Sequence, residues 1–172
     1  MLFRSIRYSG GPGFEAVDLP YGNGAFSMTI LLPDRGGSVE ATLASLDATK
    51  WGRITEGLAE QQMGIMMPKF RLEYDQHLVD ALKALGMGLA FTPDVADFTG
   101  MSPRGRDLYI YDVLQKTFVE VNEEGTEAAA VTKVEIRETS APAMVTVDRP
   151  FVFAIREKFS GTILFMGKIV EP

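Results

Sequence analysis

The sequence predicts a mixed α/β fold that is rich in β-strands and carries three short helices. In residues 26–32, large apolar side chains at the even positions alternate with Ser27, Thr29 and Leu31. This two-residue period is typical of a strand with one well-buried face. Apolar residues spaced by four and three follow in residues 38–46, as in an amphipathic helix. Residues 151–155 and 162–166 are nearly continuous apolar runs, which suits strands buried on both faces. With 172 residues, of which 46% are hydrophobic and 23% charged, the chain is expected to form one compact domain.

Residues 14–32 predict two strands joined by a tight turn. The first strand covers residues 14–19 and the second residues 26–32. Between them, residues 20–24 contain Asn23 and two glycines, which tolerate the positive φ angles of hairpin turns. We therefore expect an antiparallel hairpin here.

Three short helices are predicted between and beyond these strands. Ser38 is a suitable N-cap for the first, a second is centred on residues 51–58, and the third starts at Asp75. Gly86 is a natural C-terminal stop for the third helix. Their apolar faces are Val39, Leu43 and Leu46; Trp51, Ile54 and Leu58; and Leu78, Leu82 and Leu85.

Two further strands and one loop complete the prediction. Residues 69–74 alternate cleanly between apolar and charged side chains, and residues 108–121 form a long strand candidate. Residues 87–107 hold several glycines and prolines without a sustained period, so they are expected to be a loop that includes one helical turn.

Composition gives no support for an enzyme, a cofactor site or a nucleic-acid binder. Lysine and arginine number 17 against 23 aspartates and glutamates, and the resulting net charge of −6 weighs against binding a phosphate backbone. The absence of cysteine excludes disulfides, thiolate metal ligands and a cysteine nucleophile. His77 is the only histidine and cannot build a multi-histidine metal site. No uncharged run approaches the length of a membrane-spanning helix, so no membrane partner is expected.

Other local patterns also favour ordinary structural roles. Glu123 and Glu124 are adjacent in the chain, so their side chains do not face each other as an acid–base pair would. The methionines at positions 63, 66 and 67 form a soft apolar cluster that is expected to fill the core. The sequence therefore predicts a protein that is not an enzyme, with no cofactor and no metal.

One long segment, residues 123–143, joins the strand ending at Val121 to the C-terminal strand pair. Helix propensity alone would predict a short Ala-rich helix over residues 127–131. Long connections without fixed structure are uncommon in compact domains and are usually functional or disordered. Composition alone favours a mobile surface loop for this segment, with a functional role as the alternative.

Several stretches of the chain closely resemble the serpin family, in the family's order. Glu-Glu-Gly-Thr-Glu-Ala-Ala-Ala at 123–130 resembles the serpin hinge, and residues 148–153 and 164–168 resemble its C-terminal signatures. Residues 19–22 and 26–33 are similar to its central barrel strands. Residues 68–73 are similar to a further sheet strand, and residues 96–102 to the short helical turn that follows. The resemblance implies a truncated serpin-type fold, in which residues 1–172 are the C-terminal half of the domain. Antiparallel barrel strands, part of the main sheet and a reactive-centre loop at about 123–147 would be present.

The resemblance also implies function: a suicide-substrate inhibitor of serine proteases. In that family a protease cleaves the loop, and the loop then inserts into the main sheet before the acyl-enzyme is hydrolysed. Family spacing places the reactive bond between Thr139 and Ser140. The hinge residues would be Glu123, Glu124, Gly125, Thr126, Ala128, Ala129, Ala130 and Val131. Gly125 permits the backbone reversal, and the small uncharged residues after it can enter a crowded sheet.

Several alternatives remain open at this point. Thr139 before the bond suggests an elastase-like or subtilisin-like partner, whereas Arg137 would favour a trypsin-like protease two residues earlier. The competing function is a non-inhibitory fragment that is only a protease substrate or that self-associates by strand exchange. For the inhibitor, the missing N-terminal half of the domain is a candidate partner. Gln115 stands where the family commonly has a histidine that helps to control sheet opening. The resemblance implies an extracellular location, with a cytoplasmic one as the alternative because no signal peptide is visible.

Overall fold

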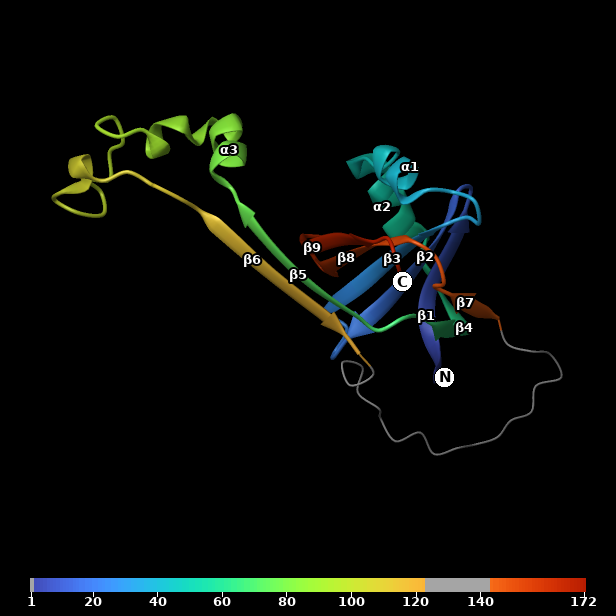
Figure 1. The fold of residues 1–172 in the computed structure, drawn as a ribbon. Coiled ribbons are helices and arrows are strands. Elements are labelled where there is room, and N and C mark those ends of the chain that lie inside the picture. The colour runs from blue at the N-terminus through green and yellow to red at the C-terminus, as the bar shows by residue number, and fades with distance from the viewer. Residues whose placement is uncertain (1, 123–142) are drawn as a thin grey trace. The chain divides into compact units, whose positions relative to one another are not determined.

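The computed structural model describes residues 2–122 and 143–172 (Figure 1). The chain divides into two compact units, one formed by Met1–Phe70 with Asn122–Pro172 and the other by Arg71–Val121. Each unit is described separately below.

The first unit is built on one seven-stranded sheet. Its strands follow the order β7-β4-β1-β2-β3-β8-β9, so β7 and β9 stand at the two ends of this order. Neighbouring strands are antiparallel except for the parallel pair of β4 and β7. The strands are β1 (Leu2–Gly11), β2 (Phe14–Tyr21), β3 (Phe26–Pro33), β4 (Ala59–Met66), β7 (Met144–Thr146), β8 (Phe151–Glu157) and β9 (Ile163–Ile169).

The predicted hairpin of β2 and β3 is confirmed. Phe14 pairs with Pro33 at one end and Tyr21 with Phe26 at the other. The Gly24 amide donates to the Tyr21 carbonyl at 2.7 Å, and Gly22 and Gly24 both have positive φ angles, 46° and 84°. The turn therefore uses glycine where the sequence analysis expected it.

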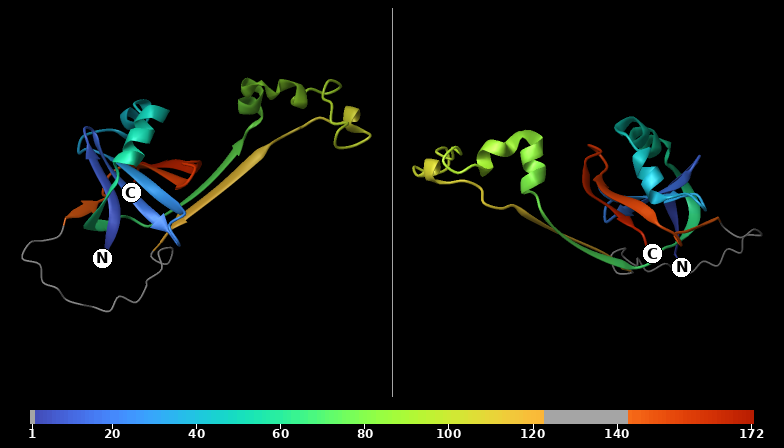
Figure 2. Two further views of the ribbon diagram at one scale, coloured as in Figure 1. Left: turned by 180° about the vertical axis from the view of Figure 1, so that it is seen from behind. Right: turned by 45° about the horizontal axis from the view of Figure 1, so that its top comes forward.

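Helices α1 (Val39–Ala44) and α2 (Ala48–Gly57) lie together on one face of this sheet (Figure 2). The predicted N-cap is confirmed, because the Ser38 hydroxyl accepts a hydrogen bond from the Ala41 amide at 3.0 Å. The Asp47 carboxylate accepts from the Lys50 amide at 2.7 Å and caps α2 in the same way. The core between helices and sheet consists of Phe14, Ala16, Leu31, Val39, Ile54, Leu58 and Val152.

Aromatic packing covers the opposite face of the sheet centre. The Phe70 ring lies 5.8 Å from the Phe151 ring and 5.5 Å from the Phe153 ring, centroid to centroid. Met28 and Ile30 are buried on this face as well. Strand β8 is thus buried on both faces, as its continuous apolar run predicts.

A charged cluster is buried on the helix-covered side of the sheet. The Arg156 guanidinium donates to Asp18 Oδ1 at 3.1 Å and to the Thr29 hydroxyl at 3.0 Å. Thr29 in turn donates to Asp18 Oδ1 at 2.6 Å. The side chain of Asp18 is fully buried and that of Arg156 is 6% exposed. A buried carboxylate needs such partners, because an unpaired charge in an apolar interior is strongly unfavourable.

The second unit is a two-stranded ribbon with a helical and looped segment. Strand β5 (Phe70–His77) pairs with β6 (Leu114–Val121), and their arrows run in opposite directions in Figure 1. Between them lie α3 (Val79–Leu82), a π-helical turn (Lys83–Met87) and two 3-10 turns. The 3-10 turns are Gly88–Phe91 and Gly105–Asp107.

Two predicted boundaries in this unit are wrong. The third helix starts at Val79 rather than Asp75, because β5 continues to His77. The strand expected over residues 108–121 forms only from Leu114, and the Leu78 amide donates to the Val113 carbonyl at 2.8 Å just before it. In both places tertiary strand pairing decides the boundary and overrides local propensity. The stop at Gly86 is confirmed by its φ of 98°.

Two predictions about apolar residues need correction. Met63 fills the core at 5% exposure, but Met66 is 54% exposed. The apolar run at residues 162–166 does form strand β9, yet β9 is not buried on both faces, since its residues Ile163 to Met166 are all exposed. Among the described residues, no helix is long and apolar enough to span a membrane.

Candidate functional site

The segment singled out by sequence lies outside the described residues except for its last residue, Ala143. This applies to the bond between Thr139 and Ser140, to Arg137, and to the hinge residues 123–126 and 128–131. The two strands that flank the segment are described. Strand β6 leads into it and β7 follows it.

Strand β6 presents the alternation that the sequence predicts. Thr117, Val119 and Val121 are half-buried, while Leu114 and Phe118 on the other face are exposed. Among the described strands, β6 is hydrogen-bonded to β5 alone. A strand paired on one side offers its other side for a further strand.

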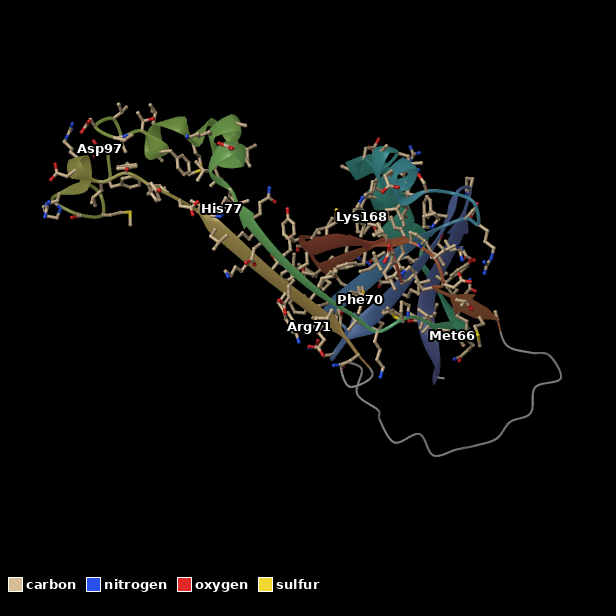
Figure 3. All side chains as sticks on the ribbon, viewed as in Figure 1. Met66, Phe70, Arg71, His77, Asp97 and Lys168 are labelled. Atoms are coloured by element: carbon tan, nitrogen blue, oxygen red, sulfur yellow. The ribbon has the colours of Figure 1, made fainter. Side chains whose placement is uncertain are left out.

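Charged and aromatic contacts tie β6 to β5. Lys116 Nζ lies 3.2 Å from Asp75 Oδ2, and the Arg71 guanidinium lies 5.0 Å from the centre of the Phe118 ring. These side chains share one face of the ribbon, and Arg71 and His77 are labelled on β5 in Figure 3. All of these contacts are exposed, so each contributes little to stability, but together they align the two strands.

His77 is the last residue of β5 and contacts Asp112, which lies just before β6. Its Nδ1 lies 2.9 Å from each carboxylate oxygen of Asp112. The hydrogen bond from His77 is the main reason that the pKa of the Asp112 carboxyl lies below its usual value. The only histidine of the sequence thus joins the end of β5 to the residues that precede β6. Within the described ranges, no three acidic or histidine side chains gather as a metal site would require.

Replacing His77 by alanine is expected to raise the Asp112 pKa toward its ordinary value. In the native chain the folded pKa lies below the unfolded one. The stabilisation is therefore present above the unfolded pKa and is lost as pH falls through the folded pKa. Carboxyl NMR titration of both forms measures the change. Asp97, whose pKa is lowered mainly by the Thr99 hydroxyl, is the control and should keep its value. An unchanged Asp112 titration in His77→Ala would contradict the assignment.

Gln115, where the sequence analysis expects a histidine in most serpins, lies on β6. Its side-chain amide donates to the Thr117 hydroxyl at 3.5 Å, on the same face of β6. This is a long hydrogen bond between two exposed groups, and such a contact is weak.

Strand β7 fixes the other end of the segment to the seven-stranded sheet. It pairs with β4 so that Gly64 lies opposite Met144 and Met66 opposite Thr146. The Gly64 amide donates to the Ala143 carbonyl at 2.9 Å, and Val145 is 3% exposed. Sequence reasoning missed this strand, because three residues show no measurable period.

A charged network anchors the chain directly after β7. Asp148 accepts hydrogen bonds from Arg35 at 2.7 Å and from Arg149 at 3.1 Å. The Arg35 hydrogen bond is the main reason that the pKa of Asp148 lies below its usual value. Arg149 also donates to the Pro33 carbonyl at 2.6 Å. The C-terminal end of the segment is therefore attached to β3 as well as to β4.

The serpin family model, described as serine protease inhibitor, matches residues 2–172. The chain belongs to the serpin family. The serpin resemblance noted from the hinge and C-terminal residues is thereby confirmed. Serpins are generally serine protease inhibitors and not enzymes.

Individual relatives agree with this assignment. An uncharacterized serpin-like protein of Thermococcus kodakarensis is 38% identical over 92% of this chain. Iripin-8 of Ixodes ricinus is 39% identical over 90% of it. The crystal structure of tengpin, a thermophilic serpin in the native state, superposes on 98% of the chain with a TM-score of 0.76 and 33% identity. The predicted mixed α/β serpin-type fold, truncated, is confirmed.

The chain spans only part of these serpins. It covers 37% of the Thermococcus protein, 40% of Iripin-8 and 44% of the tengpin chain. More than half of each relative therefore has no counterpart in these 172 residues.

Proposed function

We propose that this chain provides the reactive-centre half of a serine-type endopeptidase inhibitor that acts as a suicide substrate. Residues 1–172 would be the C-terminal half of a serpin domain, with the reactive-centre loop at about 123–147. The observation that carries the proposal is the position of β6. Among the described strands it is paired with β5 alone. It ends at Val121, and a single residue separates it from the proposed hinge sequence that starts at Glu123.

The proposed reaction is attack by the protease serine on the Thr139 carbonyl carbon. The new ester joins Thr139 to the protease, the Thr139–Ser140 amide bond breaks, and the proton goes to the new amine of Ser140. Loop residues from the hinge onward would then add to the side of β6 away from β5. Gly125 permits the reversal, and Thr126 with the alanines after it carries no charge or proline into the sheet.

The described strands indicate what happens to the C-terminal product. Residues 140–172 contain β8, which lies between β3 and β9 and buries Phe151 and Phe153. After cleavage this peptide would stay bound under native conditions, and only denaturation would release it. Trapping must therefore be measured on denatured samples.

The proposal is tested by incubating the chain with elastase and with subtilisin. We expect a protease adduct that survives denaturing electrophoresis, with the released peptide starting at Ser140 by mass spectrometry. Arg137→Ala should leave this adduct unchanged. Thr126→Arg, which brings a charge into the inserted segment, should give cleavage without an adduct. Clean cleavage of the native chain with the protease left active would refute inhibition by this chain.

A second function is favoured by the share of the relatives that the chain covers. The chain spans about two-fifths of these relatives, so the larger part of their fold has no counterpart in these 172 residues. The chain would then be a non-inhibitory fragment that is only a protease substrate or that self-associates by strand exchange.

For the inhibitory function, the proposed partners are an elastase-like or subtilisin-like protease and the N-terminal half of the domain. We propose the extracellular space as the location.

A further inference from the structure

Two polar atoms on the helix-covered side of the seven-stranded sheet are buried without a hydrogen-bond partner. The residues are Asp18 and Ser27, and both are 0% exposed. Asp18 Oδ1 accepts hydrogen bonds from Thr29 and Arg156. Asp18 Oδ2 and Ser27 Oγ, in contrast, have no hydrogen-bond partner among the residues that the structure describes. Buried polar atoms of folded proteins are hydrogen-bonded with few exceptions, either to protein or to bound water. Each of these two atoms therefore requires a partner.

The strand register places these two side chains near each other on one face. Asp18 on β2 pairs with Thr29 on β3. Ser27 lies two residues before Thr29 on β3, so its side chain points to the same face. Cβ atoms of such diagonal neighbours lie less than about 8 Å apart. Two hydrogen bonds of about 2.8 Å through one small molecule span most of that gap. One molecule can therefore contact both atoms.

A third polar group lies beside the carboxylate. Arg7 on β1 pairs directly with Asp18 on β2, so the two side chains lie on the same face. The Arg7 guanidinium donates to the Leu58 carbonyl at 2.9 Å, directly after the end of α2. A guanidinium has five N–H groups. Arg7 can therefore keep its bond to Leu58 and also donate to a molecule bound at Asp18.

The charges around Asp18 favour a neutral ligand. Its carboxylate is bonded to the Arg156 guanidinium, and Arg7 stands opposite on the neighbouring strand. These two cations would repel a metal ion. Within residues 2–122 and 143–172, moreover, no three acidic or histidine side chains gather as a metal site would require. An anion would be repelled by Asp18 Oδ2, because a carboxylate oxygen only accepts hydrogen bonds. A small neutral molecule that both donates and accepts meets these conditions.

We propose that Asp18, Ser27 and Arg7 hold one buried water molecule. The water donates to Asp18 Oδ2, shares a hydrogen bond with the Ser27 hydroxyl and accepts one from the Arg7 guanidinium. About three hydrogen bonds is the usual number for a buried water. The water completes the buried charged cluster and connects it through Arg7 to the end of α2. This inference concerns the interior of the seven-stranded unit and does not depend on the protease reaction.

The test locates and counts the water in the native chain and in a variant that fills its site. A crystal structure of the native chain should show a water within about 3.2 Å of Asp18 Oδ2. Magnetic relaxation dispersion of water counts the long-lived water molecules in solution. Ser27→Val replaces the hydroxyl by a methyl group and adds another, so it should lose one long-lived water. Thr117→Val, which removes a strand hydroxyl in the second unit, is the control and should keep the count.

Trp51 fluorescence in urea checks that both variants are folded. The crystal structure of the native chain decides the question even if Ser27→Val does not fold. A structure in which Arg7 bonds Asp18 Oδ2 directly, or in which no water lies within hydrogen-bond distance of this oxygen, would overturn the proposal. An unchanged count of long-lived waters in folded Ser27→Val would overturn it as well.

Discussion

Arg156→Ala is expected to lower the free energy of unfolding of the seven-stranded unit by about 3–5 kcal/mol. Arg156 and Thr29 are the partners of the fully buried Asp18 carboxylate, and both bond the same oxygen, Oδ1. Asp18 Oδ2 has no hydrogen-bond partner among the residues that the structure describes. Removing the guanidinium would leave a buried charge held by one hydroxyl, in a unit whose total stability is of order 5–15 kcal/mol.

Urea unfolding followed by Trp51 fluorescence measures this loss. Lys168→Ala is the matched control, because it removes a cation from the exposed pair with Glu40 and should leave the free energy of unfolding almost unchanged. The double variant Asp18→Ala with Arg156→Ala removes both charges and should be more stable than Arg156→Ala alone. If Arg156→Ala costs no more than Lys168→Ala, the buried pair does not stabilise the fold.

Sequence patterns predicted the elements whose stability is local. The β2–β3 hairpin follows from the alternation in residues 26–32 and the glycines of its turn, and α1 follows from Ser38 and its spacing. Strand β4 was missed, because its first four residues are exposed and mostly polar. Its stability comes from backbone pairing with β1, in which Ile6 lies opposite Gln61. Side-chain periodicity does not reveal such a strand.

The candidate site was located by motif, and its surroundings could not be predicted. Residues 123–131 resemble the serpin hinge closely, so they could be singled out as a candidate without structure. In contrast, Arg156 and Asp18 are 138 positions apart, and no local pattern indicates their contact. The error at β9 has a related cause. Its apolar run predicts a strand that is buried on both faces. The sequence does not indicate whether the residues that would bury it belong to these 172 residues.

Gly105→Ala is expected to disrupt the loop of the second unit that precedes β6. A Cβ at Gly105 would lie 2.0 Å from the carbonyl carbon of Phe98 and 2.2 Å from its oxygen. Both are backbone atoms, so no side-chain rotation relieves the overlap. The Gly105 carbonyl also accepts a hydrogen bond from the Phe98 amide at 3.0 Å, which keeps the two segments together. We expect a local cost at or above the upper end of roughly 1–3 kcal/mol.

Hydrogen exchange at Phe98 measures this cost, since its amide is protected by the bond to Gly105. Gly100→Ala is the matched control in the same loop, because nothing lies within 4 Å of a Cβ there and its φ is not positive. We expect the Phe98 amide to exchange at least a hundredfold faster in Gly105→Ala, which corresponds to about 2.7 kcal/mol, and at an unchanged rate in Gly100→Ala. Equal rates in the two variants would mean that this loop does not require the close approach at Gly105. In that case the start of β6 would depend on its pairing with β5 alone.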